Sequence, residues 1–349
     1  MAAKYIAERL KSYGYQADIA TFEFPTFKDL GSKILVMDEG SEIVARALIY
    51  SPPADIKTPL VFAGLGREED YDGLDVKGKV ALLGRGRITF KKKAEIAASH
   101  GAMGIIVFNN SSRPIRGASL GKPGPIPAVI ISRDEGEALK ERLERGPLLI
   151  HLKVDTIQEV KRSANVVARW PGAEEQSIVI GAHYDSVPEG PGANDNASGI
   201  SALLTIAEEI ASTPLSRRTV FVAFGAEEVG LHGSKDFVAR AGLEKLKKMS
   251  AMINLDAVGV GRAIISGDDK LVNLAREIKG LDFKVSSPSG TSYTSSDHLP
   301  FHRAKVPTLF ITSSPYREYH TPDDTIKIID IPLIENVARF TIEMLGRLP

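Results

Sequence analysis

Residues 177–199, SIVIGAHYDSVPEGPGANDNASG, constrain the fold more than any other stretch of the sequence. Residues 177–182 are apolar and rich in β-branched side chains, which is typical of a strand buried on both faces, and His183 follows directly. A loop rich in proline and glycine then carries Asp195, and residues 200–210 place apolar side chains at helical spacing. Strand, loop and helix form half of a βαβ unit, in which ligands bind outside the carboxyl end of the strand. We therefore expect a site at His183.

The same alternation of strand and helix returns along the chain. Strand-like runs separated by helical patterns are found at 165–170, 177–182, 219–224, 252–255 and 308–311. This alternation predicts an α/β fold, because the helices that connect such strands cover the faces of the sheet. We expect a three-layer αβα sandwich with a mixed, mostly parallel central sheet.

Acidic or imidazole side chains follow four of these strands. A single acid at a strand end is a weak signal, because it commonly caps the next helix. Several together on one rim of one sheet indicate a site. The residues are His183, Asp195, Glu227, Glu228, Asp256 and His320.

The charge of this rim indicates bound cations. Carboxylates gathered on one edge raise each other's pKa values unless positive charge lies among them. Two imidazoles with three carboxylates suit zinc, and they suffice for two ions if one carboxylate bridges. Two metal ions about 3.5–4 Å apart activate water against a carbonyl or phosphoryl group. Because Glu227 and Glu228 are adjacent, we expect one to bind metal and the other to hold a proton.

Residues of about 45–156 have a different texture. They contain short strand-like runs, two helical patterns and a loop rich in glycine and proline, but no acid and imidazole clustered at a strand end. The chain of 349 residues also exceeds the roughly 250–300 residues over which a single core grows. We therefore expect a main domain of 1–44 and 157–349, into which a smaller strand-rich domain, 45–156, is inserted.

Composition limits the partners. The 44 Lys and Arg residues balance 44 Asp and Glu, so we expect neither nucleic acid nor an anionic membrane as a partner. The basic segment 84–93 is interpreted as a solvated loop and first helical turn. No cysteine is present, which excludes thiolate nucleophiles and cysteine-ligated metal. The sequence shows no membrane-spanning apolar run and no signal peptide, so we expect a cytoplasmic protein.

Five motifs carry a family resemblance. They read HYDSVPEGPGANDNASG, AFGAEEVGLHGS, NLDAVG, SSDHLPF and YHTPDDT, and together they resemble the co-catalytic zinc aminopeptidases of peptidase family M28. The resemblance implies that His183 and Asp256 bind one zinc ion. It implies that Glu228 and His320 bind the other, and that Asp195 bridges the two. The insert, with KGKVALL and GAMGIIVFNN, resembles the protease-associated (PA) domain of that family.

The resemblance also implies roles for residues around the metal ligands. Asp185 matches a carboxylate that orients the ligand imidazole, and Glu227 matches the general base. Tyr319 and Tyr293 both lie where a donor to the oxyanion is expected, and we favour Tyr319. The peptide bond that follows the bridging Asp195 is expected to be cis.

The remaining histidines and one further acid are interpreted as structural. Asp297 and His298 are expected to order a loop near the site. The histidines without a comparable context are expected not to bind metal: His100, His151, His232 and His302.

Together these features predict a metalloaminopeptidase that removes N-terminal residues from peptides with a free N-terminus. Two divalent ions would activate water with Glu227 as the base; zinc is the expected metal, with cobalt or manganese as alternatives. A carboxypeptidase on the same fold stays open, because Arg317 offers a grip for a substrate α-carboxylate. A glutaminyl cyclase-like enzyme, which uses one zinc, and a non-catalytic binding protein are disfavoured by the complete ligand set.

Overall fold

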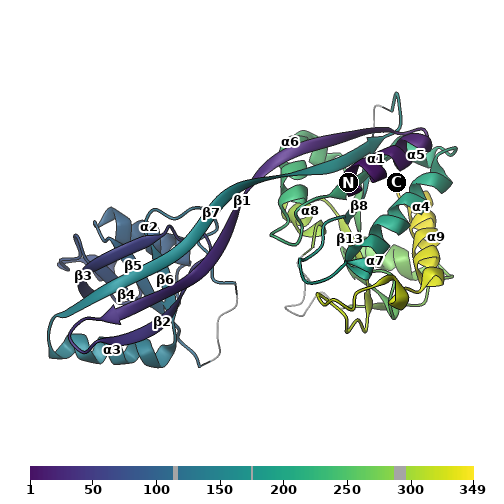
Figure 1. Ribbon diagram of the computed structural model, residues 1–349. Helices are drawn as coiled ribbons and strands as arrows, with labels where there is room; N and C mark the ends of the chain where they lie inside the picture. Colours follow the sequence, from purple (N-terminus) through teal and green to yellow (C-terminus); the bar gives the residue numbers. More distant parts are fainter. Residues whose placement is uncertain (113–116, 174–175, 287–295) are drawn as a thin grey trace. The chain divides into compact units, whose positions relative to one another are not determined.

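Two long strands connect the two units of the fold. The computed structural model describes residues 1–112, 117–173, 176–286 and 296–349. One unit comprises Met1–Phe24 with Arg162–Pro349, and the other comprises Pro25–Lys161 (Figure 1). The chain passes between them within β1 (Gln16–Val36) and β7 (Leu148–Arg169). The sequence led us to expect the domain boundaries at 44/45 and 156/157, whereas the units divide at 24/25 and 161/162. Both dividing points lie inside continuous strands, so no turn or change in residue pattern marks them in the sequence.

The first unit is built on a mixed sheet in the strand order β7-β9-β8-β10-β13-β11-β12. Neighbouring strands β9, β8, β10 and β13 are parallel, whereas β7 and β11 pair antiparallel with β9 and β13. This confirms the mixed, mostly parallel sheet. The strands are β8 (Ile178–His183), β9 (Thr219–Phe224), β10 (Ala251–Leu255), β11 (Arg262–Gly267), β12 (Phe283–Val285) and β13 (Thr308–Ser314).

Helices cover both faces of this sheet and complete the expected αβα sandwich (Figure 1). One core cluster joins Ile178 to α1 (Ala2–Ser12), α4 (Gly199–Ile210), α7 (Asp269–Arg276) and α9 (Ile331–Arg347). Another joins Val179 to α6 (His232–Lys247) and α8 (His298–Arg303). Successive side chains of a strand point to opposite faces, so the two clusters lie on opposite sides of β8. Shorter helical turns are α5 (Leu215–Arg218), η2 (Ala193–Ser198) and η3 (Ile326–Ile328).

The strand that leads to the site is buried along its whole length. All six residues of β8 are buried, as its apolar sequence predicts. Gly181 is required by close packing, because a Cβ there would lie 2.5 Å from the Phe224 ring and 2.8 Å from the Met252 side chain. The frame beneath His183 is therefore tightly packed.

The strands of the second unit lie in the order β1-β2-β6-β5-β4-β3-β7, continuous through β7 with those of the first unit, and β1 also pairs with β7. Leu139 of α3 (Arg133–Arg145) belongs to one core cluster, and Ala94 and Ile96 of α2 (Phe90–Ser99) belong to another. The expected strand-rich second domain is present. Its other elements are β2 (Ser41–Ala47), β3 (Ala54–Phe62), η1 (Glu68–Tyr71), β4 (Val80–Gly84), β5 (Gly104–Phe108) and β6 (Ala128–Ile131).

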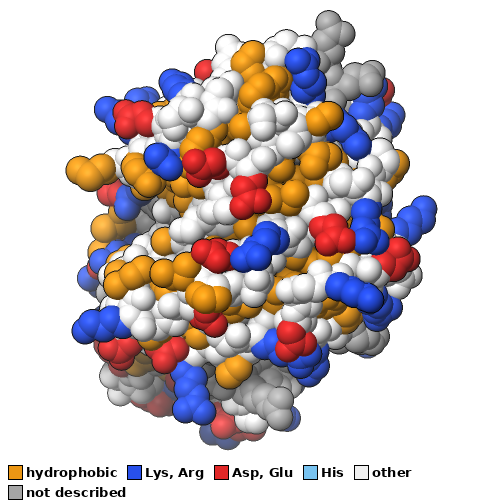
Figure 2. All heavy atoms as spheres, turned by 90° about the vertical axis from the view of Figure 1, so that its right-hand side faces the viewer, with side chains coloured by type: hydrophobic (Ala, Val, Ile, Leu, Met, Phe, Trp, Pro, Cys, Tyr) orange, Lys and Arg blue, Asp and Glu red, His pale blue; other side chains and the backbone are white. Residues whose placement is uncertain are grey.

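The visible surface carries mixed charge. Figure 2 shows acidic and basic side chains interspersed over one face, with no broad area of a single sign. This mixture agrees with the equal numbers of acidic and basic residues. Within the described residues, no helix has the length and apolar character needed to cross a membrane.

Lys93 of α2 is an unusual member of the second unit's core. Its side chain is fully buried, and its amine donates to the backbone carbonyl oxygens of Leu65 and Gly84. Both acceptors are neutral. Burial therefore lowers the pKa of Lys93 to about 8, because the charged amine loses its hydration.

Lys93 is expected to make stability rise with pH relative to a Lys93→Met variant. Between a folded pKa of about 8 and an ordinary value of 10.5, the unfolded chain binds the proton that the folded chain has lost. Folding stability then increases as pH rises through this interval. The neutral amine can still donate to both carbonyls. Urea midpoints of both proteins at pH 7 and pH 9.5 test this, and an equal difference at the two pH values would contradict it.

Candidate metal centre

The five residues expected to bind metal meet at the carboxyl edge of the parallel strands. His183 is the last residue of β8, Asp256 follows β10 and Glu228 lies in the loop after β9. Asp195 lies in the turn η2, and His320 lies in the loop after β13. Parallel strands end at one edge of a sheet, so loops far apart in sequence bring these side chains together.

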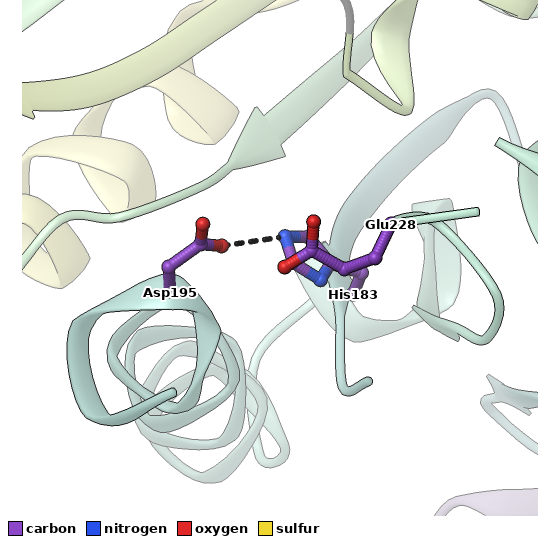
Figure 3. Close-up of side chains that lie close together, drawn as sticks. All are labelled: His183, Asp195 and Glu228. Atoms are coloured by element: carbon purple, nitrogen blue, oxygen red, sulfur yellow. Dashed lines mark ion pairs between the residues drawn. The ribbon is translucent and has the colours of Figure 1, made fainter. Parts of the chain in front are cut away.

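Asp195 lies between the two imidazoles. Its Oδ1 is 3.1 Å from His183 Nε2, and its Oδ2 is 3.3 Å from His320 Nε2. His183 Nε2 also lies 3.2 Å from Asp256 Oδ1, and His320 Nε2 lies 3.1 Å from Glu228 Oε2. Figure 3 shows the Asp195 carboxylate directed at His183, with Glu228 beside it. Each carboxylate oxygen of Asp195 thus faces a different histidine, each with its own further acid.

Burial and like charge shift the acids of this cluster. Burial, followed by the charges of nearby acids such as Asp297, raises the pKa of Glu227 to about 9. Burial and then the charge of Asp195 raise the pKa of Glu228 to about 8. Burial alone would lower the pKa of His183, but Asp256 and the other acids hold it well above its usual value. The protein therefore supplies too little positive charge to balance the negative charge of these carboxylates, as expected where cations bind.

The side chains fit a divalent cation. Among the described residues, the buried atoms Glu228 Oε1 and His320 Nε2 make no hydrogen bond, although His320 Nε2 lies close to carboxylate oxygens of Asp195 and Glu228, as a shared cation would require. In the part of the chain that the structure describes, two groups of three side chains have ligand atoms within 4.8 Å of one another: His183, Asp195 and Glu228, and His183, Glu227 and Asp256. Imidazole nitrogens with carboxylate oxygens are the ligands that zinc accepts in catalytic sites.

Asp185 contacts the site in an unexpected way. Its main-chain oxygen accepts a hydrogen bond from His183 Nδ1 at 3.1 Å, whereas its carboxylate lies 3.9 Å from that nitrogen. The carboxylate instead accepts from the backbone N–H groups of Glu227, at 3.1 Å, and Glu228, at 3.3 Å. Asp185 thereby fixes the backbone of the expected base and the adjacent ligand, in addition to its main-chain contact with the imidazole.

Tyr319 lies at the mouth of the site, whereas Tyr293 lies outside the described residues. The Tyr319 ring stacks on His320 with 3.7 Å between ring centroids, and about half of the residue is exposed. It lines a cavity of about 380 Å³ together with Glu227, Leu231 and Phe310. The peptide bond after Asp195 is cis, which confirms that expectation.

The residues interpreted as structural are not part of the ligand groups. Asp297 and His298 are buried near the site: burial and then the charge of Asp297 raise the pKa of Glu227, and His298 stacks on the cavity residue Phe310 with 4.6 Å between centroids. Elsewhere, His100 pairs with Glu68, His151 pairs with Asp55 and His232 stacks on Phe24. Over the described residues, the metal-capable groups contain none of His100, His151, His232 and His302.

Comparison with known proteins places the chain in a family. Residues 165–345 match the family described as Peptidase family M28, and residues 56–139 match the PA domain. The chain is 35% identical over 309 residues to Aminopeptidase YwaD of Bacillus subtilis (strain 168). The aligned region covers 83% of this chain and 67% of that protein. The chain belongs to peptidase family M28. This M28 chain is also 33% identical over 262 residues to a probable lipoprotein aminopeptidase, LpqL, of Mycobacterium tuberculosis, covering 72% of this chain and 52% of that protein.

Solved structures extend the likeness to the fold of this M28 member. An aminopeptidase from Aneurinibacillus sp. strain AM-1 aligns with a TM-score of 0.76 and 32% identity, covering 99% of this chain and 87% of the other. BSAP, a zinc aminopeptidase from Bacillus subtilis, aligns with a TM-score of 0.62 and 28% identity, covering 99% and 88%. The expected M28 membership and inserted PA domain are therefore confirmed.

Two buried side chains of this M28 site were not among the residues expected from the sequence. Ser296 Oγ donates to Asp256 Oδ2 at 2.6 Å and accepts from Asn254 Nδ2 at 2.8 Å. Asp324 accepts hydrogen bonds from the loop that carries Asp195. Both belong to recognised motifs, SSDHLPF and YHTPDDT, but their partners are far away in sequence. A linear pattern gives no signal for such contacts.

Ser296→Ala is expected to weaken metal binding by about 10–100-fold, because Asp256 loses the hydrogen bond that orients its carboxylate. The measurement is zinc affinity by competition with a chelator. Ser201→Ala is the matched control, because Ser201 is exposed on α4 and its hydroxyl donates to a backbone carbonyl of the same helical segment. Equal zinc affinity in both variants would show that Ser296 has no orienting role.

Proposed function

We propose that this M28 chain is a metal-dependent aminopeptidase that hydrolyses the first peptide bond of substrates with a free N-terminus. The observation that carries the proposal is the placement of Asp195, whose two carboxylate oxygens each face a different histidine. His183 and Asp256 would hold one ion, and Glu228 and His320 the other, with Asp195 shared. Zinc is the proposed metal, with cobalt or manganese as alternatives.

Two bound zinc ions would supply a water of lowered pKa and polarise the scissile carbonyl. Glu227 takes the proton from the attacking water, because it lines the cavity and is nearly buried. It then returns that proton to the leaving amine. Asp185 accepts a hydrogen bond from the backbone N–H of Glu227, which keeps the Glu227 carboxylate beside the metal ligands. Tyr319 is the proposed donor to the developing oxyanion, because it lines the same cavity.

The carboxypeptidase alternative receives no support from the cavity. Such an enzyme needs a cation that grips a substrate α-carboxylate. Arg317 is not among the described residues that line the cavity, and its backbone N–H donates to the side chain of neighbouring Glu318.

A substrate panel tests the proposal. The protein is stripped with a chelator, reloaded with zinc, cobalt or manganese, and assayed on aminoacyl 4-nitroanilides and on N-acetylated peptides with free carboxyl ends. We expect metal-dependent hydrolysis of the aminoacyl amides alone. Hydrolysis of the blocked peptides from their carboxyl ends would establish a carboxypeptidase, and cyclisation of N-terminal glutamine without hydrolysis would establish a cyclase.

A further inference from the structure

Asp324 binds the loop that carries the shared carboxylate. It is 2% exposed, and its carboxylate accepts from two consecutive backbone N–H groups, Asn194 to Oδ1 at 2.7 Å and Asp195 to Oδ2 at 3.2 Å. Its main-chain oxygen accepts from the N–H of Ala193 at 3.2 Å. Asp324 thus accepts hydrogen bonds from the backbone N–H groups of three successive residues.

Asp324 also belongs to the turn that follows His320. Its own N–H donates to the carbonyl oxygen of Thr321 at 3.2 Å, and Thr321 in turn donates to the carbonyl oxygen of Glu318 through its N–H, at 3.1 Å, and its hydroxyl, at 2.7 Å. His320 lies between these two residues. Asp324 therefore ties the turn that presents His320 to the loop that presents Asp195.

Only a carboxylate suits this position. Each of its two oxygens accepts one N–H, and an ionised carboxylate is an acceptor at both. An amide of the same shape would present an NH₂ group to one of the two N–H donors. Asp185 holds Glu227 and Glu228 in the same manner, with one oxygen on each of two consecutive N–H groups. Asp324 thus fixes the backbone of the loop that carries Asp195, and Asp185 fixes the backbone of the loop that carries Glu227 and Glu228.

We propose that Asp324 is a positioning residue that sets the Asp195 carboxylate relative to His320 and thereby controls the affinity for the metal pair; this rests on the proposed function of the site. A carboxylate that serves two ions must keep both oxygens in place. A small rotation of the Asp195 backbone moves both oxygens at once. Loss of one acceptor at Asp324 therefore weakens metal binding without removing any ligand.

The test compares Asp324→Asn with Asp323→Asn. Asp323 is the matched control, because it is the neighbouring aspartate and is exposed. In the metal-free proteins, we expect deuterium uptake by peptides that contain 193–195 to accelerate about tenfold or more in Asp324→Asn, since a charge-assisted hydrogen bond is lost. Zinc affinity, measured by chelator competition, is expected to fall by about 10–100-fold. The control is expected to match the wild type in both measurements.

The zinc concentration that gives half-maximal activity is expected to rise by the same factor as the affinity falls. As long as the metal-free variant stays folded, lower stability alone would not shift that concentration. Unchanged exchange and unchanged zinc affinity in Asp324→Asn would overturn the proposal. If Asp324→Asn does not fold, Asp324→Ser replaces it, and wild-type values in that folded variant would equally overturn it. A wild-type protein that hydrolyses no aminoacyl amide would refute the proposed function, while exchange and zinc affinity would still decide the role of Asp324.

Discussion

Glu227→Gln is expected to keep two metal ions and to lower turnover of an aminoacyl amide by about 10²–10⁴-fold or more. The substitution preserves the shape of the side chain but removes its ability to accept a proton. The backbone N–H groups of Glu227 and Glu228 stay bound to Asp185, so the neighbouring ligand is not displaced. Metal content by elemental analysis and kcat with saturating substrate are the two measurements.

The metal content of Glu227→Gln decides between two roles for this residue. Glu227 lies close enough to His183 and Asp256 to serve as a ligand as well as a base. If the variant loses both ions, Glu227 belongs to the ligand set and the proposed proton transfer is wrong. Glu227→Asp is the companion variant, because it keeps a carboxylate and should retain more activity than the glutamine variant.

Asp195→Ala is expected to abolish activity by emptying or disordering both metal positions. Each of its oxygens faces a different imidazole, so one substitution removes a ligand from two ions at once. Replacement of Ser296 or Asp324 leaves every ligand in place and should cost less. Zinc content after dialysis and the zinc-induced shift in melting temperature measure the effect.

Asp323→Ala provides the control for Asp195→Ala, because it removes an exposed aspartate from the same unit. It should bind zinc as the wild type does. If Asp195→Ala retains two zinc ions with unchanged affinity, Asp195 is not shared between them.

The strands that carry the site could be predicted from the sequence, because each one is a short apolar run that is followed closely by polar residues. The apolar run at 219–224 coincides with β9, and the run at 177–182 differs from β8 by one residue at each end. Buried parallel strands are continuous apolar segments, so their ends are visible in the sequence. The residues that follow those ends then meet at one edge, as expected for His183, Asp256 and His320.

The contacts that orient these residues were not predictable in the same way. Ser296 reaches Asp256, and Asp324 reaches Asn194, across large separations in the chain. Such hydrogen bonds depend on the packing of loops, which has no period in the sequence. The crossing within β1 was missed for a related reason, because a continuous strand gives no turn signal. Local sequence patterns therefore predict which residues reach the site, whereas tertiary packing decides how their side chains are oriented.

The division of the peptidase unit by its insert has a consequence for folding during synthesis. Tyr15 donates its hydroxyl to the carbonyl oxygen of Ala207, 192 positions later, and Leu10 shares a core cluster with α4. A chain made from its N-terminus therefore exposes the apolar face of α1 until α4 emerges, while residues 25–161 already contain all the partners of their own cores. Domains that are complete early can fold first. The order of assembly during synthesis is thus expected to be insert first and peptidase unit second.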